Sequence, residues 1–138
     1  MANGTVRVGD TFTYEMTTTT DMGAHRFQDS SPPVFATPFL VGAVEAAAAR
    51  LMEPDLAPGQ MSVGGFVELR HTKPTPLGWR VRAVARLVEL EGRKYVFDVE
   101  CFDELEQIGT ARHVRFVIDE EPFLQAVEKK VSRKEGRP

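Results

Sequence analysis

A single alanine-rich segment, residues 38–52, constrains the fold more than any other feature of this sequence. Alanine and leucine favour helix, and Thr37 followed by Pro38 is typical of a helix start, with Thr37 as the N-cap. Pro54 ends the segment. Because apolar side chains occur on nearly every face, we expect this helix to be buried rather than to lie on a surface.

Strand-like segments surround this helix in the sequence. They are residues 11–20, 60–71, 78–90, 94–103 and 107–118. Glu91-Gly92 indicates a tight hairpin turn between the third and fourth of them, and a short amphipathic helix is expected from Glu120. One helix among five mainly antiparallel strands predicts an α+β fold in which a curved sheet wraps around the helix, the hot-dog arrangement, although the pattern leaves other α+β layouts open.

Size and composition set the outer limits. A chain of 138 residues with 42% hydrophobic and 27% charged residues predicts one globular domain over residues 1–138. A net charge of −3 with interspersed signs argues against nucleic acid as a partner. No apolar run is long enough to span a membrane. The lone Cys101 is typical of a reducing, cytoplasmic compartment.

Glu45 is the most informative residue for function. It lies in the middle of the apolar helix, and no base occupies a position at helical spacing from it. An unpaired buried carboxylate costs free energy and has a raised pKa, which favours acid–base or nucleophilic work. The alternative is that Glu45 pairs with a base from the sheet or from a subunit interface.

His71 ends a strand whose odd positions include Val63, Gly65, Val67 and Leu69. Strand alternation places His71 on the same face as Val67 and Leu69, which we expect to be the inner face. The imidazole is therefore a candidate proton shuttle, although a hydrogen-bonded structural histidine is the alternative.

Two further sites are less specific. The hydroxyl of Thr37 is expected at the start of the helix, where it is a cap, a substrate ligand or a nucleophile. Gly64-Gly65 interrupts the strand that carries His71, which indicates either a bulge or an N–H exposed to a substrate carbonyl.

Several well-known chemistries lack their motifs. The sequence has no G-x-S-x-G elbow, no Walker loop and no dinucleotide-binding glycine pattern. His25, His71, His113 and Cys101 do not have the spacing of metal ligands, so no metal and no cofactor are expected.

Several short motifs are recognisable along the chain. They are Val34-Phe35-Ala36-Thr37-Pro38, Gly42-Ala43-Val44-Glu45, Ser62-Val63-Gly64-Gly65, His71-Thr72-Lys73-Pro74-Thr75-Pro76-Leu77-Gly78, Glu91-Gly92-Arg93, Ile108-Gly109 and His113-Val114-Arg115. Together they cover roughly residues 7–120 and resemble the fluoroacetyl-CoA thioesterase family. The spacing of Thr37, Glu45 and His71 agrees with that family's Thr–Glu–His constellation.

The resemblance implies a homodimeric hot-dog enzyme that hydrolyses acyl-CoA thioesters at its subunit interface. It implies that Thr37, Glu45 and His71 are catalytic and that Gly64 and Arg115 hold the substrate. Whether Thr37 attacks the thioester or positions it stays open, as does whether Glu45 is the nucleophile or a base. A non-catalytic acyl-CoA-binding protein is the alternative function, and a hydratase is less consistent because its characteristic loop is missing.

The sequence also departs from the family. The specialised fluoroacetyl enzyme carries phenylalanines just upstream of the threonine motif, whereas residues 28–33 here contain no aromatic side chain. Ala111 stands where the family often has glycine. We therefore expect hydrolysis of a short or medium acyl-CoA without specificity for fluoroacetyl-CoA.

Overall fold

A computed structural model describes residues 5–137. The main elements are β1 (Thr11–Thr17), α1 (Thr37–Met52), β2 (Gln60–His71), β3 (Arg80–Glu91), β4 (Lys94–Phe102), β5 (Gln107–Asp119) and α2 (Glu120–Lys134). Short 3-10 turns occur at Thr20–Met22, Ala24–Arg26 and Glu53–Asp55. These elements confirm the expected order of strands and helices, with ends that differ from the predicted ones by a few residues.

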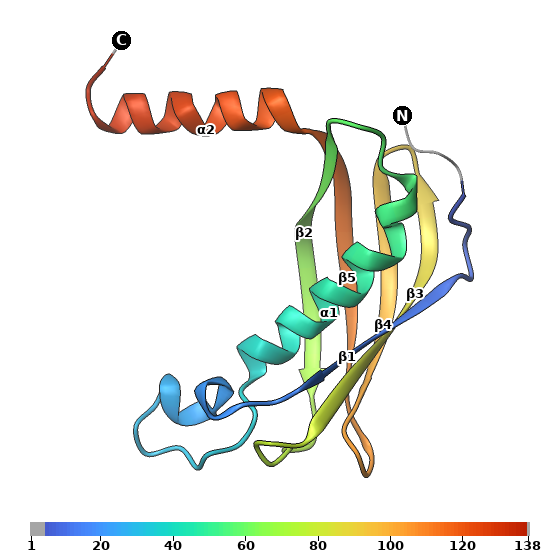
Figure 1. The fold of residues 1–138 in the computed structure, drawn as a ribbon, viewed down its shortest axis with the longest axis vertical. Helices are drawn as coiled ribbons and strands as arrows, with labels where there is room; N and C mark the ends of the chain where they lie inside the picture. Colours follow the sequence, from blue (N-terminus) through green and yellow to red (C-terminus); the bar gives the residue numbers. More distant parts are fainter. Residues whose placement is uncertain (1–4, 138) are drawn as a thin grey trace.

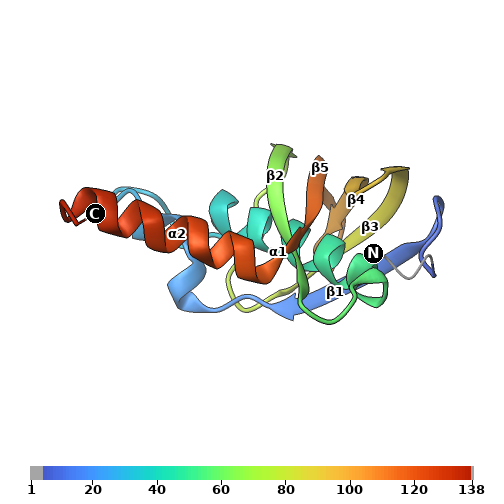
Figure 2. The same ribbon diagram turned by 90° about the horizontal axis from the view of Figure 1, so that it is seen from above.

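The five strands form one antiparallel sheet in the order β1-β3-β4-β5-β2. The sheet curls around α1, which crosses its concave side (Figures 1 and 2). This arrangement confirms the hot-dog fold. It leaves β1 and β2 as the two edge strands, and α1 begins next to the end of β2.

The core lies between α1 and the concave face of the sheet. Leu40, Val44, Ala47 and Ala48 of α1 are fully buried, as expected for a helix that is apolar on nearly every face. Small alanines on β3, such as Ala83 and Ala85, let the sheet approach the helix closely.

The β2 strand contains a β-bulge, a register shift between Gly64 and Phe66 relative to β5. Beyond the bulge Val67, Leu69 and His71 face the helix, opposite the concave-side residues of β5. The predicted face of His71, shared with Val67 and Leu69, is therefore confirmed. Val63 pairs with Phe116 and lies on the opposite face, because one extra residue in a strand reverses the alternation. Gly65 lies against the outward ring of Phe116.

Asp55, at the end of the turn after α1, anchors the segment before β1. Its fully buried carboxylate accepts hydrogen bonds from the backbone N–H groups of Thr5 and Val6, from the Thr5 hydroxyl and, at 2.6 Å, from the Tyr95 hydroxyl. Burial raises the pKa of Asp55, but these bonds together outweigh burial and hold the pKa below its ordinary value. Burial, together with the bond to Asp55, raises the pKa of Tyr95.

The α2 helix projects past the β2 edge and makes little contact with the rest of the chain (Figures 1 and 2). Its apolar side chains Phe123, Leu124, Val127 and Val131 are exposed. Neither α2 nor any other helix within residues 5–137 is long and apolar enough to cross a membrane.

Candidate active site

Thr37 and His71 form a hydrogen-bonded pair at the start of α1. The Thr37 Oγ1 and the His71 Nδ1 are 2.8 Å apart. Thr37 is not the N-cap that the sequence predicts: Ala36 holds that position, and Thr37 is the first helical residue. Its hydroxyl is therefore directed to the imidazole rather than to the helix backbone.

The other ring nitrogen of His71, Nε2, is buried and has no hydrogen-bond partner. No other side-chain nitrogen or oxygen atom within residues 5–137 is in this state, which is rare in folded proteins. Burial lowers the pKa of His71 below that of a free imidazole. A neutral imidazole bonded to a hydroxyl is able to accept its proton. Thr37 and His71 also line an open cleft of about 290 Å³, together with Ala24, Val34, Phe35, Ala36, Thr72, Lys73 and Pro74.

Glu45 lies two turns further along α1 and has a partner from the sheet. Its Oε2 is 3.6 Å from Nη1 of Arg115 on β5, and its side chain is 46% exposed. The expectation of an unpaired buried carboxylate is therefore wrong. The alternative that Glu45 pairs with a base from the sheet is confirmed, because β5 runs beneath α1 and turns Arg115 toward it.

Gly64 makes room for this pair. A Cβ atom at Gly64 would lie 2.7 Å from the Glu45 Oε2, 3.1 Å from the His113 Cε1 and 3.3 Å from the Arg115 Nη1. The prediction of a bulge at Gly64-Gly65 is confirmed. Gly64 also provides the close approach that glycine allows inside a strand.

Two members of this group, Ser62 and His113, were not predicted from the sequence as site residues. Ser62 accepts hydrogen bonds from Arg115 through its hydroxyl and its carbonyl oxygen, each at 3.1 Å. The fully buried His113 lies 3.3 Å from Arg115 through Nε2. Alternation along β5 places His113 and Arg115 on one face. This spacing is the sequence pattern from which His113 could have been predicted to lie beside Arg115.

One protomer therefore holds two groups of polar side chains. Thr37 is eight residues before Glu45 on the same helix, so their Cα atoms are about 12 Å apart along its axis. Both groups lie on the concave side of the sheet, next to β2. The structure brings Thr37 to His71, and Glu45 to Gly64 and Arg115, but it does not bring Glu45 into contact with His71.

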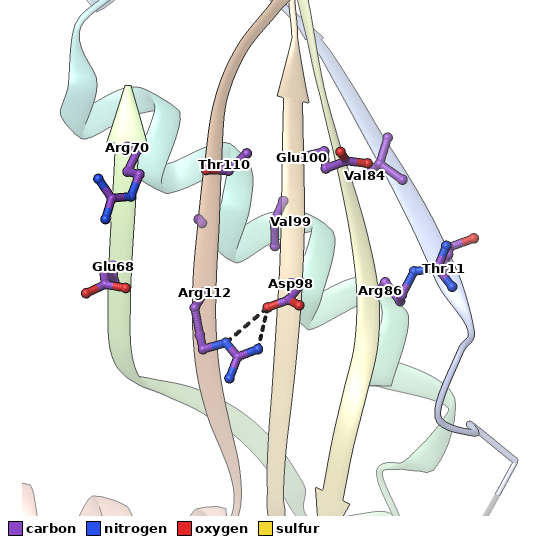
Figure 3. Close-up of a pocket in the computed structure, with 11 residues that line it drawn as sticks. Thr11, Glu68, Arg70, Val84, Arg86, Asp98, Val99, Glu100, Thr110 and Arg112 are labelled. Atoms are coloured by element: carbon purple, nitrogen blue, oxygen red, sulfur yellow. Dashed lines mark hydrogen bonds and ion pairs between the residues drawn. The ribbon is translucent and has the colours of Figure 1, made fainter. Parts of the chain in front are cut away.

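A hollow of about 480 Å³ lies on the opposite, convex face of the sheet (Figure 3). Charged side chains dominate its lining, and Arg112 and Asp98 form a cross-strand ion pair there at 2.9 Å. Both of these side chains are about half exposed. None of the candidate site residues borders this hollow, so it is a solvated surface rather than part of the site.

Residues 5–137 contain no group of three or more histidine, cysteine, aspartate or glutamate side chains placed to hold a metal ion.

The structure is similar to solved members of the thioesterase superfamily. A hypothetical protein of Thermus thermophilus, described as a thioesterase superfamily member, matches with a TM-score of 0.89 and 29% identity, covering 97% of this chain and 99% of its own. A fluoroacetyl-CoA thioesterase structure matches with a TM-score of 0.85 and 36% identity, covering 91% and 97%. The class is therefore that of hot-dog thioesterase-like proteins.

The model of the family "Fluoroacetyl-CoA-specific thioesterase" matches residues 18–121. The fluoroacetyl-CoA thioesterase of Streptantibioticus cattleyicolor is 36% identical over 131 residues, which are 91% of this chain and 94% of that protein. This chain belongs to the fluoroacetyl-CoA-specific thioesterase family.

Replacing Gly64 by alanine tests whether the space beneath Glu45 matters. We expect Gly64→Ala to displace the Glu45 carboxylate and to lower kcat/KM for an acyl-CoA by about 10-fold or more, because small displacements in a site are costly. Gly42→Ala is the matched control, since a Cβ at Gly42 meets nothing within 4 Å. It should keep activity and raise Tm, because alanine favours helix. Equal activity of the two variants would contradict the role of Gly64.

Proposed function

We propose that this protein is an acyl-CoA thioesterase that hydrolyses a short or medium acyl-CoA to the free acid and CoA. Membership of a family named for thioester hydrolysis supports this function, as does a related structure described in complex with fluoroacetate and CoA. The observation that carries the proposal is the Thr37–His71 pair, in which a half-buried imidazole of lowered pKa lies 2.8 Å from a hydroxyl at a helix start.

We assign Thr37, His71 and Glu45 to the catalytic steps. His71 accepts a proton from Thr37 or from a water molecule, and the oxygen so activated attacks the thioester carbonyl. The C–S bond then breaks, and the CoA thiolate leaves with the proton that His71 returns to it. If Thr37 was the nucleophile, a water molecule activated by His71 then hydrolyses the acyl ester on Thr37 to the free acid. N–H groups at the start of α1 or at Gly64 stabilise the oxyanion. Glu45 is the second acid–base or nucleophilic group, and Arg115 and Gly64 hold the substrate.

Water is the only co-reactant that this hydrolysis needs, so we propose no cofactor, and CoA enters as part of the substrate. The absence of aromatic side chains at residues 28–33 supports an acyl group other than fluoroacetyl. The free thiol of Cys101 supports a reducing, cytoplasmic location.

We propose that the working form is a homodimer with its active sites at the interface. Within residues 5–137 no strand pairs with the outer edge of β2, and an open edge of 12 residues tends to pair. The α2 helix projects past the same edge (Figure 1), and its apolar side chains are exposed. Light scattering after gel filtration should give twice the chain mass of 15.4 kDa. The mass of a single chain would contradict the dimer.

A panel of acyl-CoAs, assayed by the release of free thiol, tests the enzymatic function. We expect hydrolysis of short or medium acyl-CoAs, with no preference for fluoroacetyl-CoA over acetyl-CoA. If the protein binds several acyl-CoAs and hydrolyses none, it is a binding protein, and the thioesterase proposal fails.

The pH dependence of kcat/KM tests the role of His71. A base must be neutral to accept a proton, so protonation of His71 abolishes activity. Since burial lowers its pKa below the ordinary 6.5, we expect kcat/KM to rise with pH, with a midpoint below 6.5, and to be level by about pH 7. A midpoint above 7 would be inconsistent with this half-buried imidazole as the base.

A further inference from the structure

Both ring nitrogens of His113 have a partner. Its Nδ1 is 2.7 Å from the carbonyl oxygen of Phe66, and its Nε2 is 3.3 Å from Nη1 of Arg115. The side chain is 1% exposed, and the ring of Phe97 packs beside it with 6.4 Å between ring centroids.

These two partners determine the protonation of the ring. A carbonyl oxygen only accepts, so Nδ1 carries the hydrogen, and a guanidinium only donates, so Nε2 is a bare acceptor. A proton on Nε2 would face the Arg115 cation. Burial has the largest effect on the pKa of His113 and lowers it, and the charge of Arg115 lowers it as well. The Phe66 carbonyl and Glu45 raise the pKa, but the net shift is downward. The ring is therefore a neutral acceptor for Arg115.

Arg115 is held from three sides. Its Nε and Nη2 donate to the hydroxyl and the carbonyl oxygen of Ser62, while Nη1 lies between His113 and Glu45. Of the residues of β5, His113 is the one that contacts Nη1, the nitrogen that faces Glu45. The Glu45 carboxylate is 46% exposed, whereas the Arg115 side chain is 9% exposed. Solvent therefore competes for the carboxylate, and the ion pair by itself holds it only weakly.

We propose that His113 is a positioning residue, whose neutral imidazole holds the Arg115 guanidinium against Glu45 and so sets the direction of that carboxylate in the active site. This role rests on the proposed thioesterase function. The bulge in β2 contributes to it, because it disrupts the regular ladder near Phe66. The carbonyl oxygen of Phe66 then fixes the ring from the far side.

Two amide substitutions separate the two bonds of His113. In His113→Gln, the amide oxygen reaches the place of Nε2 and accepts from Arg115. In His113→Asn, the shorter amide replaces only the bond to Phe66. We expect the Gln variant to keep kcat/KM within about three-fold and the Asn variant to lose about 10-fold or more, at similar Tm. Equal losses in the two variants would overturn the proposal.

A cycle with Glu45 tests whether His113 acts through that carboxylate. In a Glu45→Ala background, His113→Asn should cause no further loss of kcat, since the positioned group is gone. A purely structural histidine would lower activity by the same factor in both backgrounds, and that result would overturn the proposal.

Nitrogen NMR of the imidazole gives a readout that needs no substrate. Long-range proton–nitrogen correlations of His113 should show the tautomer protonated on Nδ1 at neutral pH. The other tautomer, or a ring that titrates like free histidine, would overturn the positioning geometry. Failure of wild-type hydrolysis would instead overturn the thioesterase function, so the two failures are distinguishable.

Discussion

Replacing His71 by alanine is expected to lower kcat/KM for a hydrolysed acyl-CoA by about 10²–10⁴-fold, the usual contribution of a positioned general base. The Thr37 hydroxyl, 2.8 Å from Nδ1, loses its acceptor in this variant. KM should change much less, because the imidazole acts on the reacting groups rather than on the CoA moiety. Steady-state kinetics with thiol detection give both values.

His25→Ala is the matched control, because His25 is exposed on the turn before α1, and it should keep wild-type activity. Thr37→Val should resemble His71→Ala if the two side chains work as a unit. The kcat/KM of the double variant should then be no lower than that of the less active single variant. If the losses of the two single variants multiply in the double variant, Thr37 and His71 do not act as a unit. If His71→Ala keeps more than a third of wild-type activity, His71 is not the general base.

Replacing Asp55 by alanine is expected to destabilise the fold by about 3 kcal/mol, because it leaves buried donors without an acceptor. The donors are the N–H groups of Thr5 and Val6 and the hydroxyls of Thr5 and Tyr95. For a chain of this size the loss corresponds to a fall in Tm of about 10 °C. Urea unfolding followed by circular dichroism measures it.

Asp98→Ala is the control for Asp55→Ala, since the ion pair of Asp98 with Arg112 is half exposed and contributes at most about 1 kcal/mol. The effect of Asp55→Ala should also depend on pH. Because the folded pKa of Asp55 is lowered, its ionisation stabilises the fold above the unfolded value of 3.8, and this contribution disappears as the pH falls through the folded pKa. The difference from wild type should therefore narrow near pH 3, and a constant difference would contradict the charge-based anchor.

Local patterns were sufficient for the secondary structure. The composition of residues 38–52 specifies a buried helix, and alternation with turn residues specifies the strands. The same patterns placed His71 on the concave face correctly, since the alternation from Val67 onward is undisturbed. The alternation does not continue across the bulge to Val63, and no local signal in the sequence fixes the residue at which a bulge reverses it.

The partners of the site residues depend on contacts between distant segments. Arg115 is 70 residues from Glu45 in the sequence, and only the antiparallel pairing of β5 with β2 brings it under α1. For the same reason Thr37 reads locally as a cap, yet its hydroxyl faces His71, since β2 ends beside the start of the helix.

The sequence by itself therefore determined the single buried helix and the five strands, because propensity and periodicity are properties of neighbouring residues. It also determined the candidates Thr37, Glu45 and His71, through their residue types and the family spacing. Only the tertiary structure decided that Glu45 is paired, that Gly64 provides the space for the pair, and that His113 and Ser62 hold Arg115. Those contacts follow from strand register and from the bulge, and both are decided when the sheet closes around α1.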